Sequence, residues 1–471
     1  MKTLAALLFG AALAAGTLAT VRAREGSPPM TEVRFMTLDP GHFHAALVQK
    51  EMYPGVSRKV DVYAPLGSDL IDHLARVGRF NTRKESPTAW ELEVHTGPDS
   101  LERLCRERPG NAVVVSGRNR GKIGRVQASL DAGLHAVVDK PWILESSDLP
   151  RLEAALDTAE RRGLVALDIM TERFEVTTEL QRELVNDREA FGGVLPGTEL
   201  EPAVYMESVH HLMKTVAGVP NIRPAWFFDT EEQGEGLNDI GTHLVDLAQW
   251  TLFPEQALDY RKDVRVRQAQ RWPTLIPRAD FKRVTGEDFP ESLRARVKDG
   301  ALEYFCNTLV SYTVRDVHVT LNVIWDWEAP SGSGDTHFAS YRGSLSKVEV
   351  RQGPSDQYKS ALYVVPNRAA DKTAVVTAVK KRIAAVQAEY PGTEVVDLGP
   401  ELRIQIPERL RVGHEEHFAQ VTRRFLQYVR DRGTLPAWER PDMLAKYYVT
   451  TEGVRLARLS PPRPAPRRAP R

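Results

Sequence analysis

The feature that most constrains the fold is a regular alternation of strand-like and helix-like segments between residues 32 and 176. Six apolar runs have the composition of strands: "EVRFMTL", "RKVDVYAP", "ELEVHTG", "NAVVVSG", "HAVVDKP" and "LVALDIM". Between them, "HAALVQKEM", "KIGRVQASLDAG" and "SSDLPRLEAALDTAERRG" have helical patterns, and the last two end at glycine. "NAVVVSG" is apolar throughout, as a strand buried on both faces should be. Strands that alternate with helices need right-handed crossovers, so this region predicts a parallel, doubly wound Rossmann sheet.

The pattern changes after about Arg173. "AVYMESVHHLMK", "NTLVSYTVRDVHVTLNVIWDWEA", "HFASYRGSLSKVEVRQG" and "ELRIQIPE" are β-rich and partly alternating, and "LNDIGTHLVDLAQWTLF" and "AVVTAVKKRIAAVQAEY" are helical. This predicts a second α+β domain with a largely antiparallel sheet, in which Trp325 and Trp327 pack. The predicted division is a signal peptide (1–23), a linker (24–31), the Rossmann domain (32–176), an α+β substrate and oligomerisation domain (177–455) and a disordered Pro/Arg-rich tail (456–471).

The first residues have the layout of a secretory signal peptide. Lys2 precedes an apolar run from Leu4 to Thr20, and Val21-Arg22-Ala23 is a small-residue cleavage site, which places cleavage near Ala23. An uncleaved anchor is the alternative, but the run is rich in Ala and Gly and short for a span of about 20 residues. We therefore expect an exported, periplasmic protein of Sec type with no membrane contact after cleavage.

Charge and cysteine content exclude some classes. Lys+Arg 63 balances Asp+Glu 63, so no global field favours nucleic acid as a partner. Cys105 and Cys306 are the two cysteines and lie in different predicted domains, so we expect two buried free thiols. No Cys/His group has zinc-ligand spacing, so no metal is expected.

The turn after the first strand raises the question of a nucleotide site. It reads D-P-G-H-F-H, where a dinucleotide-binding fold usually carries G-x-G-x-x-G for a tight turn, approach to pyrophosphate and helix packing. Gly41 keeps the second of these roles, and Asp39 can hold the turn through its side chain. His44 predicts a wider helix–strand contact, while His42 and Phe43 would lie over the helix N-terminus, where phosphate binds. Alone, the motif fits an ordinary strand–turn–helix equally well.

Two later motifs carry acid–base chemistry. Lys140, within "VVDKPW", ends a buried strand, and ligands bind outside the carboxyl ends of strands in such sheets. Asp239, His243 and Asp246 have i, i+4, i+7 spacing in a predicted helix, so they share one face. A helical Asp and His that face a cleft form a general acid–base pair. Each motif alone also fits surface polar residues.

Together and in this order, the motifs resemble the Gfo/Idh/MocA family (glucose–fructose oxidoreductase and inositol dehydrogenase). The resemblance covers about Glu32 to Trp250. The family's glutamate-lysine-proline corresponds to "DKP", its Gly-rich Asp-x-x-x-His segment to "GEGLNDIGTH", and its "RF" after the sixth strand to Arg173-Phe174. Its Thr-Pro-Asn loop corresponds to Gly117-Arg118-Asn119, so the asparagine matches, and Lys122 stands where the family often has histidine. "GDTHFASYRGS" and "LPAWERPDMLAKYYVTT" resemble an exported bacterial subgroup of this family, which also tends to carry "DPGHFHAALVQK".

The resemblance implies NAD or NADP as cofactor, and a C-terminal open sheet that often forms an oligomer interface, hence a homo-oligomer. The predicted cofactor-binding residues are Asp39, Gly41, His42, Phe43, Ser116, Asn119, Lys140 and Pro141. The choice between NAD and NADP is open, because Asp61 has about the right spacing for a ribose ligand but lies in mid-strand. Because no free pool of nicotinamide nucleotide exists outside the cytoplasm, a tightly held cofactor recycled in each turnover is expected.

The predicted reaction is hydride transfer between the nicotinamide and a carbohydrate or polyol carbon. His243 takes or gives the hydroxyl proton, Asp239 orients it or binds substrate, and Lys140 stabilises the oxyanion. The predicted substrate-pocket residues are Arg173, His210, His211, Lys214, Trp226 and His337. Two alternatives stay open: a redox-assisted glycoside hydrolase or lyase with internally recycled cofactor, and a non-catalytic sugar-binding module.

Overall fold

A computed structural model of the chain describes residues 32–216, 219–220, 222–329 and 332–464. The predicted signal peptide, the predicted linker and residues 465–471 of the predicted tail lie outside the described residues. Within the described part of the chain, no helix has the length and apolarity that a membrane span requires.

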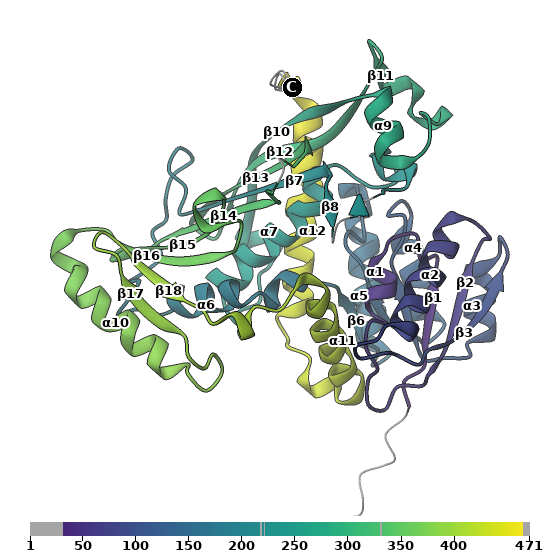
Figure 1. Ribbon diagram of the computed structural model, residues 1–471, viewed down its shortest axis with the longest axis horizontal. Helices are drawn as coiled ribbons and strands as arrows, with labels where there is room; N and C mark the ends of the chain where they lie inside the picture. The colour runs from purple at the N-terminus through teal and green to yellow at the C-terminus, as the bar shows by residue number, and fades with distance from the viewer. Residues whose placement is uncertain (1–31, 217–218, 221, 330–331, 465–471) are drawn as a thin grey trace, which may run out of the picture. The chain divides into compact units, whose positions relative to one another are not determined.

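The N-terminal part forms the predicted parallel sheet (Figure 1). Its order is β3-β2-β1-β4-β5-β6, and every neighbouring pair is parallel. The order in which successive strands are added to the sheet reverses between β1 and β4, and doubly wound sheets bind ligands at such a point. The strands are β1 (Phe35–Leu38), β2 (Lys59–Ala64), β3 (Glu91–Thr96), β4 (Ala112–Val115), β5 (His135–Val138) and β6 (Ala166–Asp168). The helices between them are α1 (His44–Leu47), α2 (Ser68–Thr82), α3 (Ser100–Glu107), α4 (Lys122–Asp131) and α5 (Leu149–Arg161).

Helix α1 is shorter than the sequence predicted. It ends at Leu47 instead of continuing through "VQKEM". The following carbonyls are bound by side chains from elsewhere: the Trp90 indole N–H donates to the Gln49 carbonyl at 2.6 Å, and Arg83 donates to the Lys50 carbonyl at 2.6 Å. These bonds satisfy the carbonyl groups without another helical turn.

The second part is the predicted, largely antiparallel sheet of ten strands. Its order is β10-β12-β13-β7-β14-β15-β16-β18-β17, with β11 paired to β12, and only β7 and β13 are parallel neighbours among its described strands. Trp325 and Trp327 pack within it as predicted. The strands are β7 (Val204–Met213), β10 (Val264–Pro277), β11 (Val297–Lys298), β12 (Ala301–Val314), β13 (Val317–Glu328), β14 (Thr336–Arg342), β15 (Ser346–Gln352), β16 (Ala361–Pro366), β17 (Glu394–Asp397) and β18 (Leu402–Gln405); β8 (Thr215–Val216) and β9 (Val219–Pro220) form a separate pair.

Helix α7 (Gly236–Leu252) packs on this sheet and carries the predicted acid–base residues. It begins with a capping box between Glu235 and Asn238. Gly236 is required at its start, because a Cβ there would lie 1.8 Å from the Cys306 carbonyl oxygen of β12. The same hydrophobic core includes residues of α6 (Val176–Val185) and α10 (Lys372–Ala385). Two short helices, α8 (Tyr260–Asp263) and α9 (Arg278–Thr285), flank β10.

Two C-terminal helices, which the sequence reading placed in the second domain, pack on the parallel sheet. Phe418 and Phe425 of α11 (His414–Arg430) join the core beneath one face, and Met443 and Tyr447 of α12 (Glu439–Leu459) join the core of the other. Along the chain the two sheets divide near residue 176, but the core of the parallel sheet is completed by residues beyond 414. The tail boundary needs a correction, because residues 456–459 form the last turn of α12.

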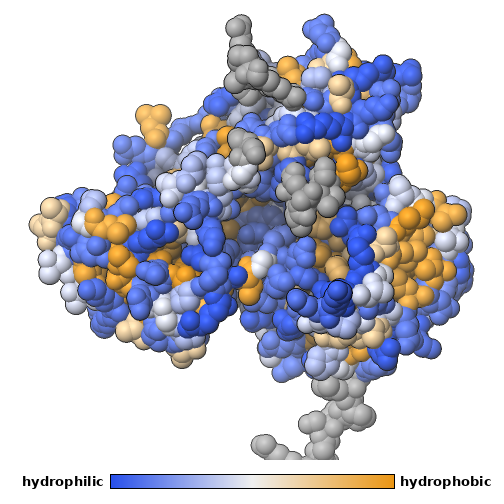
Figure 2. Space-filling view, in the orientation of Figure 1, coloured by the Kyte–Doolittle hydropathy of each residue, from blue (hydrophilic) through white to orange (hydrophobic). Residues whose placement is uncertain are grey.

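The visible face of the molecule is mostly hydrophilic, with apolar groups gathered where β2, α2 and α3 lie (Figure 2). Leu66 and Ile71 are exposed in this region. Both cysteines are free, as expected, and Cys306 is buried, but Cys105 is partly exposed, which corrects the prediction of two buried thiols. The predicted oligomer is not tested by a single chain and stays a prediction.

Candidate active site

The turn after β1 shares two backbone features with nucleotide-binding loops, a left-handed first residue and a close approach of the loop after β4, although its glycines differ. Asp39 adopts φ 47°, the left-handed conformation that glycine usually supplies there, and its N–H donates to the Tyr63 carbonyl at 3.0 Å. The loop after β4 approaches closely, because a Cβ on Gly117 would lie 2.2 Å from the Asp39 carbonyl oxygen. The usual fingerprint places a close-packing glycine in the loop after the first strand. Here that glycine is Gly117, in the loop after β4.

The amides of this turn are bonded within the protein. The Gly41 N–H donates to the Asp39 carbonyl at 2.8 Å, and the His42 N–H donates to the Ser116 carbonyl at 3.2 Å. In a usual dinucleotide site such amides and the following helix N-terminus bind the pyrophosphate. Here α1 has only four residues, so its dipole is weak. These internal bonds fix the shape of the loop and leave fewer free donors than the usual motif offers.

Asp139, which directly follows β5, gathers side chains from the segments that follow β1 and β4. Its Oδ2 lies 2.8 Å from His42 Nδ1 and accepts a bond from the Ser116 hydroxyl at 2.9 Å. His44 Nδ1 lies 3.1 Å from both carboxylate oxygens. We call His42, His44, Ser116 and Asp139 the Asp139 cluster. His42 and Ser116 were predicted to bind cofactor directly, and in the structure both side chains are turned to Asp139.

Lys140, which follows β5 of the parallel sheet, forms a buried ion pair with Asp239 of α7, which packs on the ten-stranded sheet. Its Nζ donates to the Asp239 carboxylate and lies 3.2 Å from the Asp239 backbone carbonyl. Burial opposes the charged carboxylate, but Lys140 beside it lowers the pKa of Asp239 to about 2. The sequence predicted that these two residues share a site, and the structure brings them into contact. Asp239 was expected to orient the proton transfer or to bind substrate, and in the structure its carboxylate is bonded to Lys140.

His243 lies one turn further along α7 with a free ring nitrogen. Its Nδ1 is buried and has no hydrogen-bond partner among the described residues. Burial, together with the nearby Lys140 charge, lowers the pKa of His243 to about 4, so the ring is neutral at pH 7. A buried neutral imidazole with an unused nitrogen is suited to accept a proton from a bound hydroxyl group.

Glu172 is a charged neighbour of His243 that the sequence analysis missed. It pairs with His414 of α11 at 3.3 Å, and burial is overcome by His414 and His243, which lower its pKa well below the usual range. Glu172 adjoins the "RF" pair, and "HEEH" at residues 414–417 carries two histidines at i, i+3. These were the available sequence signals, but nothing in the sequence joins the two segments.

Four of the predicted substrate residues lie at one end of the ten-stranded sheet. His210 Nδ1 and His211 Nδ1 lie 3.3 and 3.2 Å from the Asp335 carboxylate, which also pairs with Lys214. Burial favours the neutral acid, but these three partners lower the pKa of Asp335 far below its usual value. His337 is close to Glu172 and His210, and burial lowers its pKa to about 4. His210 and His337 thus face the same group of charges as the α7 residues.

Arg173 and Asn119 have structural partners in place of the predicted ligands. Arg173 donates to both Asp246 oxygens at 2.6 Å and to Glu439 at about 3 Å. Asn119 donates to the Gln233 carbonyl at 2.7 Å and accepts from Lys122 at 2.6 Å. Their polar atoms are used to hold segments together. Trp226, the predicted sugar platform, is buried with the Arg118 guanidinium 5.6 Å from its ring centre.

Asp61 is not placed to choose between NAD and NADP. Its carboxylate accepts two bonds from Arg34, at 2.6 and 3.0 Å, and lies 3.1 Å from His95. The side chain is almost wholly buried in the sheet. The spacing that suggested a ribose ligand therefore reflects an internal ion pair. Beyond β2, Asp69 lies against the loop after β1, since a Cβ on Gly41 would lie 3.0 Å from its carboxylate.

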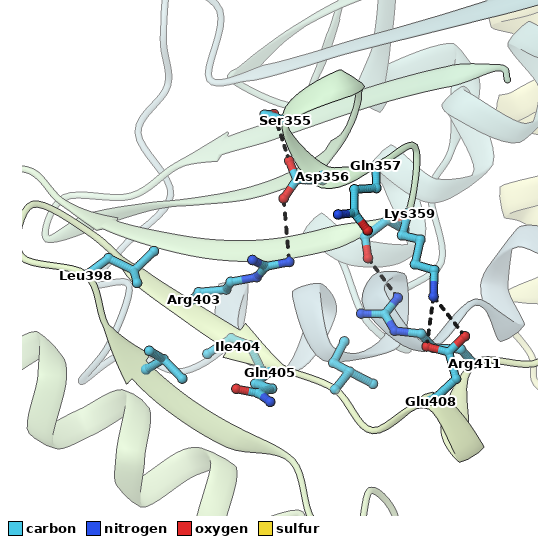
Figure 3. A pocket seen from close by; sticks show the side chains of 13 residues that line it. Ser355, Asp356, Gln357, Lys359, Leu398, Arg403, Ile404, Gln405, Glu408 and Arg411 are labelled. Carbon is cyan, nitrogen blue, oxygen red and sulfur yellow. Dashed lines mark hydrogen bonds and ion pairs between the residues drawn. The ribbon is translucent and has the colours of Figure 1, made fainter. Parts of the chain in front are cut away.

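Two cavities lie away from Lys140 and His243. One, of about 460 Å³, lies beside β18, and Figure 3 shows Arg403 turned to Asp356 and Lys359 turned to Glu408 within it. Arg403 and Lys359 are thereby paired with carboxylates, and Arg411 donates to the Ser360 carbonyl at 2.7 Å. The other, of about 650 Å³, is bordered by Arg173 and by the rings of Trp250, Tyr428 and Trp438.

The fold and the site together define a Rossmann-type oxidoreductase with a second, largely antiparallel domain. Residues 180–458 match the family described as "Putative oxidoreductase C terminal domain". The crystal structure of a "putative oxidoreductase" from Parabacteroides merdae is 44% identical, with a TM-score of 0.89 over 91% of this chain and 98% of that chain. The chain belongs to this family, and the resemblance to the Gfo/Idh/MocA family is confirmed. It is an oxidoreductase of this type.

More distant structures share the fold alone. GenD2 from gentamicin A biosynthesis, crystallised with NAD, is 16% identical with a TM-score of 0.55, covering 93% of this chain and 97% of that chain. KijD10, a 3-ketoreductase from Actinomadura kijaniata crystallised with NADP and TDP-benzene, is 14% identical with a TM-score of 0.53, covering 92% and 98%. A search of curated proteins found no match.

Proposed function

We propose that the protein oxidises or reduces a carbohydrate or polyol hydroxyl carbon with a tightly bound NAD or NADP. The observation that carries this proposal is the buried Lys140–Asp239 pair beside His243, whose Nδ1 has no partner in the described chain. A pure binding module has no need of such an acid–base set. The NAD and NADP complexes of GenD2 and KijD10 support the cofactor by fold.

The residues fit a nicotinamide dinucleotide at the switch point of the parallel sheet. Asp39 and Gly117 give the loops after β1 and β4 the close approach that such a cofactor requires. Lys140 follows β5 at the same edge, outside the carboxyl ends of the strands, where ligands bind in such sheets. The orphaned His243 Nδ1 is a buried polar atom that a substrate hydroxyl would satisfy. The bound nicotinamide supplies a hydride acceptor or donor.

The protein's own residues then handle the proton and the charge. In the oxidative direction His243 accepts the hydroxyl proton, since its ring is neutral above about pH 4. Lys140 stabilises negative charge that develops on the substrate oxygen. Asp239 holds the Lys140 ammonium in place through its ion pair. The paired Asp335, His210 and Lys214 provide polar contacts at the far side of the site.

Mass spectrometry of small molecules released from the purified, denatured full chain tests the cofactor. We expect NAD or NADP at near one per chain, because an exported enzyme must retain its cofactor. If none is released and neither nucleotide binds when added, the oxidoreductase proposal fails. If both nucleotides exchange freely, the protein still has the site but not the internal recycling.

Replacing His243 with asparagine should lower kcat by about 10²- to 10⁴-fold, because a positioned base contributes about this much. Nucleotide occupancy should be unchanged. For the unmodified protein, oxidation should be independent of pH above about 5 and should fall as pH drops through about 4, since protonation removes the base. The matched control is His318→Gln in β13, which should keep full activity. A variant at His243 with normal kcat would show that another group takes the proton.

Redox-assisted hydrolysis is a second candidate, and the Glu172–His414 pair favours it. An elimination needs a second base beside the one that handles the hydroxyl proton, and this pair lies close enough to His243 to shift its pKa. A cleaved glycoside with no net change in bound cofactor would identify this reaction. A ketone product with reduced cofactor would identify simple oxidation.

A further inference from the structure

We propose that His42, His44 and Asp139 form a binding site for one divalent transition-metal cation. His42 Nδ1 lies 2.8 Å and His44 Nδ1 lies 3.1 Å from Asp139 oxygens, and one ligand atom of each residue lies within 4.8 Å of the others. A cation with bonds of about 2.0–2.2 Å to three ligands at right angles would separate them by about 2.8–3.1 Å. The two nitrogen–oxygen separations match this spacing, and the two imidazole nitrogens lie within 4.8 Å of each other.

The donor set selects the class of cation. Two imidazole nitrogens and one carboxylate on one face leave other coordination positions open, an arrangement typical of Zn²⁺, Co²⁺, Ni²⁺ and Fe²⁺ sites. Mg²⁺ and Ca²⁺ prefer oxygen ligands and should not bind. The site is reached from the His42 side, because the His42 side chain is 23% exposed while that of Asp139 is 3% exposed.

Surrounding groups already hold the ligands in position. The sheet order places β4 between β1 and β5, so Ser116, which follows β4, lies between the His42 turn and Asp139. Its hydroxyl donates to Asp139 Oδ2 at 2.9 Å, and Lys122 donates to the Asp139 backbone carbonyl at 2.8 Å. Metal sites characteristically have such supporting hydrogen bonds on their ligating carboxylates.

The location suggests what the cation does, and this step rests on the proposed function. The Gly41 and His42 amides are bonded within the protein, and α1 is too short for a strong dipole. These groups therefore offer little positive charge to the cofactor's pyrophosphate, and a cation at the Asp139 cluster would supply it. Dinucleotide binding should then weaken when the metal is removed.

A second group of possible ligands provides the matched control. Asp61, Glu93 and His95 also have ligand atoms within 4.8 Å of one another. However, the Arg34 guanidinium donates two hydrogen bonds to the Asp61 carboxylate, so a cationic group already lies where a metal ion would bind. His95→Gln should therefore leave metal binding unchanged.

The test is a Co²⁺ titration of the full chain, without a histidine tag and after chelator treatment, followed by absorption and calorimetry. We expect one Co²⁺ per chain, displaced by Zn²⁺ but not by Mg²⁺. His42→Ala, at a partly exposed side chain that should not affect folding, should weaken binding by more than about 100-fold, since loss of a ligand exceeds the effect of losing a supporting group. Circular dichroism verifies that the variant is folded.

The outcomes separate this inference from the proposed function. No Co²⁺ or Zn²⁺ binding, or equal binding by His42→Ala, would overturn the metal site and leave three hydrogen-bonded side chains. Metal binding without any dinucleotide binding would support the metal site while the proposed function fails. Dinucleotide binding without metal binding would overturn the metal site and support the cofactor site of the proposed function.

Discussion

Replacing Lys140 with methionine should reduce turnover by at least about 10²- to 10³-fold, because removal of one group that stabilises an oxyanion has this effect. The same change leaves the buried Asp239 carboxylate without its cation. An unpaired buried charge costs about 3–5 kcal/mol, so the free energy of unfolding should fall by this amount. Initial rates and urea denaturation on the same preparation measure both effects.

A double variant distinguishes chemistry from folding. Lys140→Met with Asp239→Asn removes both charges, so most of the lost stability should return. Turnover should stay as low as in the single variant, since no cation remains beside the reacting oxygen. If the double variant regained turnover, Lys140 would matter only for stability. If the single variant kept turnover within tenfold of the unmodified protein, Lys140 would have no part in the reaction.

The two sheets could be predicted because local patterns determine them. A strand buried on both faces must be apolar throughout, as β4 is. Two neighbouring parallel strands must be joined by a crossover connection, which in this region is a helix. Lys140 and Asp239 were found for a similar reason: one ends a buried strand, and the other shares a helix face with His243. Each signal lies within a few residues of sequence.

The rest of the site depends on contacts between distant segments. Asp139 gathers His42 and His44 only because β1 and β5 flank β4 in the sheet. The partner of Glu172 is His414, which lies on the C-terminal helix α11. Asp61 shows the converse: its spacing suggested a ribose ligand, but its carboxylate is bonded to Arg34, which directly precedes β1. Sequence spacing cannot show which partner a polar side chain meets.

Lys446 of α12 should be the residue whose loss most weakens the attachment of the C-terminal helix. Its side chain is 1% exposed, and its Nζ lies 2.9 Å from Asp168 and 3.2 Å from Asp246. Lys446→Met should lower the free energy of unfolding by about 3–5 kcal/mol, because two buried carboxylates lose a shared cation. Lys381→Met, which removes a fully exposed pair with Glu189, should leave urea denaturation unchanged.

Lys446, Asp168 and Asp246 lie on three elements that must pack together for the active site to form. Asp168 ends β6 of the parallel sheet, Asp246 lies on α7 three residues after His243, and Lys446 joins both. Arg173 still pairs with Asp246 in the variant, so the greater cost falls on Asp168. Its Oδ2 then keeps the bond from the Tyr447 hydroxyl at 2.9 Å, and its Oδ1 has no hydrogen-bond partner in the described chain. Adding Asp168→Asn should therefore restore much of the stability. If it restored none, the loss would come from the packing of the lysine stem, and the ion group would not be what holds α12 to the sheet.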